Sequence, residues 1–196
     1  MITERDKDII EFIDKIGFAS IKNISDMFFT DCRYGYDLAR KRLKKIYEVN
    51  RYIKKFTNLE TNEIVYAPID SRIKRVSIHN MKILEYICKL RCLGCEIDEV
   101  EFEPMFGDIK PDLYITFKFN NYEYFQILEL QVRHDFVDLE RYNKPKTLDE
   151  IVKRTGDILP KLVIIQDTRK DYVYDNTTQF EIAQLGLDMK GMAKVL

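Results

Sequence analysis

The sequence contains no tryptophan, only two histidines and four cysteines, and no long apolar run. Without about 18 consecutive apolar residues, it has no segment of the kind that spans a membrane. The opening residues, MITERDKD, are too charged for a secretory signal peptide. Four cysteines without such a signal indicate reduced thiols, so we expect a cytoplasmic protein. Low-complexity tracts and internal repeats are also missing.

The composition is that of a globular protein with a charged surface, since 45% of the 196 residues are hydrophobic and 33% are charged. The charge is unevenly distributed along the chain. Residues 1–76 carry 16 basic and 12 acidic side chains, whereas residues 77–196 carry 16 basic and 21 acidic ones. This asymmetry predicts two domains, 1–76 and 77–196, with different partners.

The most unusual stretch is Arg33–Lys55, which holds nine Lys and Arg residues against two acidic residues. Its apolar and aromatic positions recur at helical spacing and predict a helix over Gly35–Asn50. The expected buried stripe is Tyr36, Ala39, Leu43, Ile46, Tyr47 and Asn50. Lys41 and Lys45 should then point away from the core. The alternative is that the block of charge is only a solvated face.

The neighbouring segments also show clear helix and strand signals. Thr3 and Asp6 have the spacing of a capping box, which predicts a helix over Glu4–Ile16 that ends at Gly17. Ser20 can cap a second, short helix. Two strand-like runs follow the basic helix and are separated by a polar turn, which predicts a β-hairpin. These runs are Arg51–Phe56 and Glu63–Pro68.

Two helices, a basic helix and a hairpin occur in the order of a winged helix-turn-helix, whose third helix enters the major groove of DNA. We therefore expect the first domain to bind double-stranded DNA. Cationic side chains attract phosphates without regard to sequence, so they predict affinity better than specificity. The alternative is a module of this fold that contacts proteins. The candidate DNA-binding residues are Arg33, Arg40, Lys41, Arg42, Lys44, Lys45, Lys54 and Lys55.

A further helix is predicted over Ile78–Leu93, and three cysteines lie on it or just after it. Cys88, Cys92 and Cys95 have a spacing that could hold zinc or an iron–sulfur cluster. The first two fall on an apparently regular helix, which favours buried, small apolar side chains instead.

The second domain is predicted to contain strands over Pro111–Phe119 and Tyr122–Val132, joined by Asn120-Asn121 in a tight hairpin. This register places Asp112 opposite Glu129, with Cβ atoms roughly 4.5–5.5 Å apart. Two carboxylates at that distance can share Mg²⁺ and support phosphodiester hydrolysis. The same face would carry Lys110 and Gln131, and Glu85 could add a third carboxylate. In the alternative interpretation the acids pair with Lys110, Arg133 or Arg141.

Later segments complete an α/β domain with a mixed central sheet. Lys161–Asp167 and Glu181–Leu187 read as strands, and Thr147–Leu159 is helical by composition. The predicted fold is therefore α+β or α/β: a winged helix-turn-helix followed by a small α/β domain.

At these residues the chain resembles the replication-relaxation proteins of bacterial plasmids and phages. The resemblance covers roughly residues 3–165 and depends on the order of elements and on the block LYITF…FQILELQVRHD. The second half of that family is similar to PD-(D/E)XK nucleases. The resemblance implies that Asp112 and Glu129 occupy its acidic positions. Gln131 stands where the family pattern has lysine, which argues against catalysis.

The resemblance implies a DNA-binding protein that acts in replication control or transcriptional regulation, with an inactive nuclease-like second domain and no cofactor. One alternative is a Mg²⁺-dependent endonuclease that is targeted by the winged helix, with Asp112, Glu129, Gln131 and Lys110 as catalytic residues and Asp112, Glu129 and Glu85 as metal ligands. Another is a module that recruits replication or regulatory proteins. A homodimer would be compatible with paired half-sites in DNA.

Overall fold

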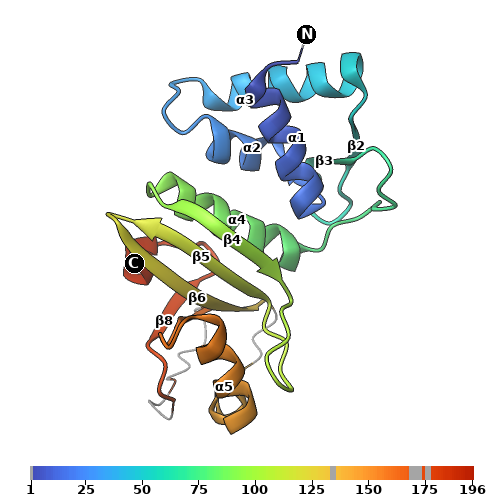
Figure 1. The fold of residues 1–196 in the computed structure, drawn as a ribbon. Coiled ribbons are helices and arrows are strands. Elements are labelled where there is room, and N and C mark those ends of the chain that lie inside the picture. Colours follow the sequence, from blue (N-terminus) through green and yellow to red (C-terminus); the bar gives the residue numbers. More distant parts are fainter. Residues whose placement is uncertain (1, 133–135, 168–173, 175–177) are drawn as a thin grey trace. The chain divides into compact units, whose positions relative to one another are not determined.

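The computed structural model describes residues 2–132, 136–167, 174 and 178–196 (Figure 1). The fold is mixed α+β, and the chain divides into two compact units, Met1–Cys92 and Leu93–Leu196. The division lies after α4 (Ile78–Cys92), whereas the predicted boundary at residue 76 assigned this helix to the second domain. The difference arises because α4 packs on α2 (Ile21–Phe28). Within the described ranges, no helix is long and apolar enough to cross a membrane.

Two capping boxes set the starts of the first helices. α1 (Glu4–Ile16) begins at the predicted Thr3–Asp6 box and ends at Gly17, whose φ of 91° lies in the left-handed region. In α2, Ser20 is the predicted cap, and Asn23 completes the reciprocal pair of hydrogen bonds. Local hydrogen bonds of this kind satisfy the free N–H groups of a first turn and therefore fix where a helix starts.

The basic segment forms α3 (Gly35–Lys45), and a π-helical turn, η1 (Ile46–Asn50), continues it. Gly35 allows the close approach of the preceding turn, because a Cβ atom there would lie 2.7 Å from the carbonyl oxygen of Phe29. Ala39, Leu43 and Ile46 are fully buried, as predicted. The prediction was wrong for Tyr36, which is 54% exposed, and Tyr47 and Asn50 are only partly buried.

The first unit also contains a three-stranded antiparallel sheet. β1 (Ala19–Ser20) and β2 (Ile53–Thr57) pair on either side of β3 (Ile64–Pro68). The hairpin between β2 and β3 is the predicted one. In the loop that joins the two strands, the buried side chain of Asn58 donates to the carbonyl of Val76 and accepts from the N–H of the same residue, at 2.9 and 3.3 Å.

The second unit contains a mixed five-stranded sheet in the order β4-β5-β6-β7-β8. The first three strands are antiparallel, and β7 and β8 add to β6 in parallel. A mixed central sheet was predicted, and this coarse feature is confirmed. The strands are β4 (Glu96–Phe102), β5 (Leu113–Phe119), β6 (Tyr122–Gln131), β7 (Lys161–Gln166) and β8 (Ile182–Gly186).

The predicted register between β5 and β6 is confirmed, with Leu113 opposite Leu128 and Phe119 opposite Tyr122. One face of the sheet packs against the segment that contains η2 (Glu140–Asn143) and α5 (Pro145–Arg154). α5 begins two residues before the predicted helix and ends at Arg154 instead of Leu159. The core cluster on this face includes Tyr114, Ile127, Tyr142, Ile151 and Ile164. A last 3-10 turn, η3 (Met192–Val195), lies near the C-terminus.

Candidate nucleic-acid interface and buried carboxylate site

The outward face of α3 carries a cluster of positive charge. Because Ala39 and Leu43 occupy the core, the positions on the opposite side of the helix must face solvent. Arg40, Lys41 and Lys44 lie there and are exposed. Lys41 forms no ion pair among the residues that the structure describes, and Lys44 lies 3.8 Å from Glu48. This face therefore presents several cations in a short length of helix.

One flank of α3 turns toward α1 instead. Arg42 Nη1 lies 3.5 Å from Oδ2 of Asp6, a carboxylate that is only 1% exposed. Burial alone would raise the pKa of Asp6, but hydrogen bonds from Thr3 and the charges of Arg42 and Lys45 lower it below its ordinary value. The expectation that Lys45 points directly into solvent was wrong, since this side chain is half-buried near Asp6.

The remaining candidates lie at the ends of the basic segment and in the hairpin. Lys54 donates to the carbonyl of Ser71, so its charge is held against the protein. Lys55 is exposed, and its ammonium lies 4.6 Å from the ring centre of Tyr47. Arg33 is exposed as well and lies over the ring of Tyr34. Five of the eight predicted DNA-binding side chains are thus exposed: Arg33, Arg40, Lys41, Lys44 and Lys55.

The two acidic residues predicted to form a site in the second unit, Asp112 and Glu129, lie at neighbouring strand ends, in the register predicted from the sequence. Asp112 directly precedes β5, and its Oδ2 accepts a hydrogen bond from the N–H of Leu130 at 2.7 Å. Glu129 lies near the end of β6 and is only 3% exposed. The charge of Asp112 is close enough to contribute to the raised pKa of Glu129.

Glu129 is held by two side chains from η2. Arg141 and the hydroxyl of Tyr142 both donate to its Oε1. Burial raises the pKa of Glu129, although the charge of Arg141 and the hydrogen bond from Tyr142 partly offset this effect. Burial also raises the pKa of Tyr142 well above its ordinary value, so its hydroxyl remains a donor. The sequence interpretation in which an acid pairs with Arg141 therefore agrees with the structure.

The other predicted members of this site have different surroundings. Lys110 is exposed and pairs with Glu103. Gln131 ends β6 opposite Gln166 of β7, and the oxygen of Gln166 accepts a 2.8 Å hydrogen bond from Tyr174. Arg133, which the sequence also offered as a partner for the acids, lies outside the described residues.

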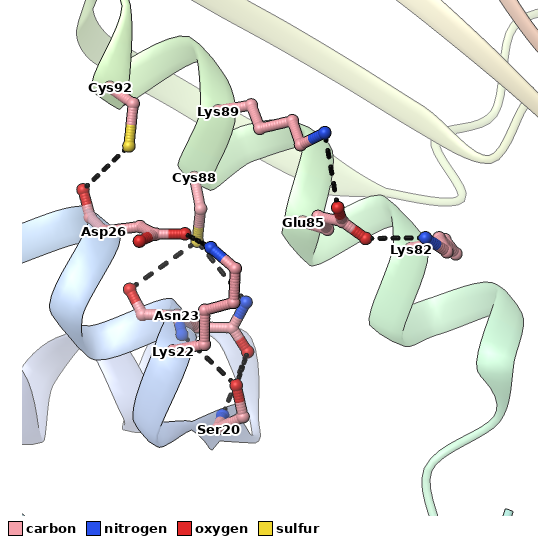
Figure 2. A network of polar contacts seen from close by, with 9 residues as sticks. All are labelled: Ser20, Lys22, Asn23, Asp26, Lys82, Glu85, Cys88, Lys89 and Cys92. Carbon is pink, nitrogen blue, oxygen red and sulfur yellow. Dashed lines mark hydrogen bonds and ion pairs between the residues drawn. The ribbon is translucent and has the colours of Figure 1, made fainter. Parts of the chain in front are cut away.

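Glu85, the proposed third carboxylate, lies on α4 in the first unit. Its side chain pairs with Lys82 at 2.8 Å and with Lys89 at 3.4 Å (Figure 2). Both partners lie on the same helix, at spacings of three and four residues, where side chains meet on one face. The structure therefore accounts for the charge of Glu85 without a metal ion.

The donor set at Asp112 and Glu129 does not fit Mg²⁺ in the arrangement described. This ion requires several oxygen ligands in octahedral geometry, whereas Glu129 Oε1 is already the acceptor for a guanidinium and a hydroxyl. Arg141 would also repel a second cation. In the part of the chain that the structure describes, no group of three His, Cys, Asp or Glu side chains is arranged to hold a metal ion.

The three cysteines of the predicted motif have different surroundings. Cys88 is buried against α2, where Asn23 donates to its sulfur at 3.6 Å and the thiol donates to the Asn23 carbonyl at 3.7 Å (Figure 2). Burial raises the pKa of Cys88 far above its ordinary value, so the thiol stays protonated. Cys92 donates to the carbonyl of Asp26 at 3.7 Å. Cys95 is buried in the second unit.

The partners that sequence analysis missed are mainly long-range ones. The pairs Asp6–Arg42 and Asn23–Cys88 join residues that are far apart in the chain, and no local pattern indicates them. Tyr142 had a weak signal, because it follows an arginine that was already a candidate partner of the acids. In comparisons with known proteins, no protein-family model matches the chain, and neither a curated protein nor a solved structure matches it.

Proposed function

We propose that this chain binds double-stranded DNA and that α3 is its recognition helix. The observation that carries the proposal is the outward face of α3, where Arg40, Lys41 and Lys44 are exposed together. Arg33 and Lys55 extend the positive charge beyond both ends of the helix. Exposed cations of this density favour a polyanion, and binding to duplex DNA releases its condensed counterions.

The order of elements in the first unit supports a winged helix-turn-helix. α1, β1, α2 and α3 are followed by the β2–β3 hairpin, and β1 pairs with β3. α2 and α3 pack against each other, as the two helices of a helix-turn-helix do. In this interpretation α3 enters the major groove, and Lys55 on β2 lies near the phosphate backbone. The half-buried Arg42 and Lys45 help to hold α3 on α1.

We assign the second unit a scaffold role on a nuclease-like fold of the PD-(D/E)XK type. The mixed sheet and the position of Asp112 and Glu129 at adjacent strand ends support the likeness. The contacts of Glu129 with Arg141 and Tyr142 favour a stabilising role over hydrolysis. The biological setting that we propose is that of the replication-relaxation proteins: replication or transcription control in a plasmid or phage.

The test measures binding of the full chain to a fluorescein-labelled duplex of mixed sequence. Lys41→Glu with Lys44→Glu should abolish the anisotropy change, because both side chains lie on the exposed face of α3. The matched control is Lys144→Glu with Lys153→Glu, two exposed lysines of the second unit whose reversal alters the net charge equally. All variants should melt within a few degrees of the wild type, since surface substitutions rarely change stability by more than about 0.5 kcal/mol.

The control separates the two explanations of a lost signal. If the α3 variant and the control bind equally weakly, the overall charge of the protein governs binding and α3 has no special role. If the α3 variant binds as tightly as the wild type, α3 is not the recognition helix. If the wild type bound no duplex at low salt, the proposal would be wrong.

A further inference from the structure

Asp37 is an acidic residue on a surface of α3 whose other charged side chains are Lys and Arg. It is the only acidic residue of α3, and it lies on the same exposed face as Lys41 and Lys44. A carboxylate there repels phosphates and so weakens general affinity for DNA. Its Oδ1 accepts a hydrogen bond from Nη2 of Arg40 at 3.2 Å, and the two side chains are 55% and 60% exposed. The carboxylate therefore holds one guanidinium while that guanidinium remains accessible.

A held guanidinium suits base recognition better than phosphate binding. Its planar fork donates two parallel hydrogen bonds, and the O6 and N7 acceptors of guanine in the major groove match that geometry. A free arginine loses rotamer freedom when it forms this pair. Asp37 removes part of that loss in advance, because its hydrogen bond restricts the side chain before DNA arrives. Asp37 would thus lower the affinity for DNA in general and raise the preference for one base over the others.

We propose that Arg40, positioned by Asp37, reads a guanine in the major groove and is the residue that gives this protein sequence specificity. The inference rests on the proposed function, since it assigns a role within the same DNA-binding face. Arg40 lies in the first two turns of α3, and the N-terminal residues of a recognition helix are those that contact base edges.

The other cations of α3 have different roles. Lys41 and Lys44 have no carboxylate at hydrogen-bond distance among the described residues, so they suit phosphates as mobile point charges. Arg42 is turned toward Asp6 on α1 and is half-buried. Arg40 is thus the exposed arginine of α3 that a neighbouring carboxylate orients.

The experiment selects DNA with the full-length protein from a pool of duplexes that have a random core of about two helical turns. The bound fraction is sequenced for the wild type, Arg40→Lys, Asp37→Asn and Lys41→Ala. The wild type should enrich a motif that contains guanine. Arg40→Lys keeps the charge but loses the fork, so preference at one guanine should fall by roughly 5- to 150-fold, which corresponds to about 1–3 kcal/mol.

The remaining variants distinguish recognition of a specific base from general attraction between cations and phosphates. Asp37→Asn should reduce the preference at that same guanine without lowering affinity for the unselected pool. Lys41→Ala should weaken binding to all sequences alike and leave the motif unchanged. A motif that persists in Arg40→Lys overturns the inference, and so does a wild type that enriches no motif. Salt-dependent binding to the pool would leave the proposed function standing in both cases, whereas a wild type that binds no duplex removes both proposals.

Discussion

The contact between Glu129 and Arg141 gives the sharpest prediction for stability. Substitution Arg141→Met removes the guanidinium and keeps most of the apolar stem, so a carboxylate that is only 3% exposed loses its opposite charge. Breaking a buried ion pair by removing one partner costs about 3–5 kcal/mol. The side chain of Arg141 is 30% exposed, and water can therefore replace part of its effect. We expect a loss of about 3 kcal/mol, at the lower end of that range.

A second substitution should recover most of the stability that Arg141→Met loses. In Glu129→Gln with Arg141→Met, the amide oxygen can still accept from the hydroxyl of Tyr142, and no charge remains buried. Replacement of both members of a buried pair by neutral groups is often close to neutral. The double variant should therefore unfold within about 1 kcal/mol of the wild type.

The loss should also depend on pH, with a sign fixed by the raised pKa of Glu129. A carboxyl group whose pKa is higher in the folded state contributes its full stability below the unfolded value, about 4.3, and loses it as the pH rises through the folded value. Without Arg141, the pKa in the folded state rises further, because the charge that lowers it is gone. The gap between Arg141→Met and the wild type should widen as the pH increases above about 4.3.

Urea unfolding followed by circular dichroism at about pH 5 and about pH 8 measures all three effects. Lys153→Met is the control, since it removes a charge from an exposed position of the same unit. The reasoning fails if the double variant is as unstable as Arg141→Met at the higher pH. It also fails if Arg141→Met unfolds like the control at both pH values.

Three further predictions concern the proposed DNA-binding face, the thiols and the acidic pair. The logarithm of DNA affinity should fall linearly with the logarithm of salt concentration, and Lys41→Ala with Lys44→Ala should reduce the slope by about 2; a slope unchanged in titrations would exclude phosphate contacts by these lysines. Iodoacetamide should modify Cys92 before Cys88, because burial raises the pKa of Cys88 more strongly; faster labelling of Cys88 in peptide mapping would contradict the structure. Supercoiled DNA should remain intact with Mg²⁺ or Mn²⁺, and cleavage that is lost in Asp112→Ala would establish an endonuclease.

Elements with local signals could be predicted from the sequence. The Thr3–Asp6 capping box fixes the start of α1, and the pair Asn120-Asn121 sets the register of the β5–β6 hairpin. Both asparagines adopt positive φ, 51° and 66°, which a two-residue hairpin turn of type I′ requires. Such signals depend on neighbouring residues alone, so they remain valid whatever the rest of the chain does.

The surface of α3 was predicted less well, because tertiary contacts change the exposure that an isolated helix would have. Lys45 was expected to face solvent, yet the negative charge of Asp6 lies near it. Tyr36 was expected in the core, yet it is 54% exposed. The predicted helix end at Asn50 was correct, but the last five residues, Ile46–Asn50, form a π-helical turn. Hydrophobic periodicity gives the side of a helix that is buried and leaves its flanks undetermined.

The acidic pair shows most clearly what strand pairing cannot supply. Register alone brings Asp112 beside Glu129, and the same arrangement serves either a metal site or an ion pair. The deciding residue, Arg141, comes from outside the sheet and supplies the positive charge that a cation would otherwise provide. An ion that competes for Glu129 must first displace it. Displacement of Arg141 would cost the energy of this contact, so the affinity of Glu129 for Mg²⁺ would be lower than that of an unpaired carboxylate. Hydrolysis at these carboxylates would therefore require Arg141 to move away from Glu129.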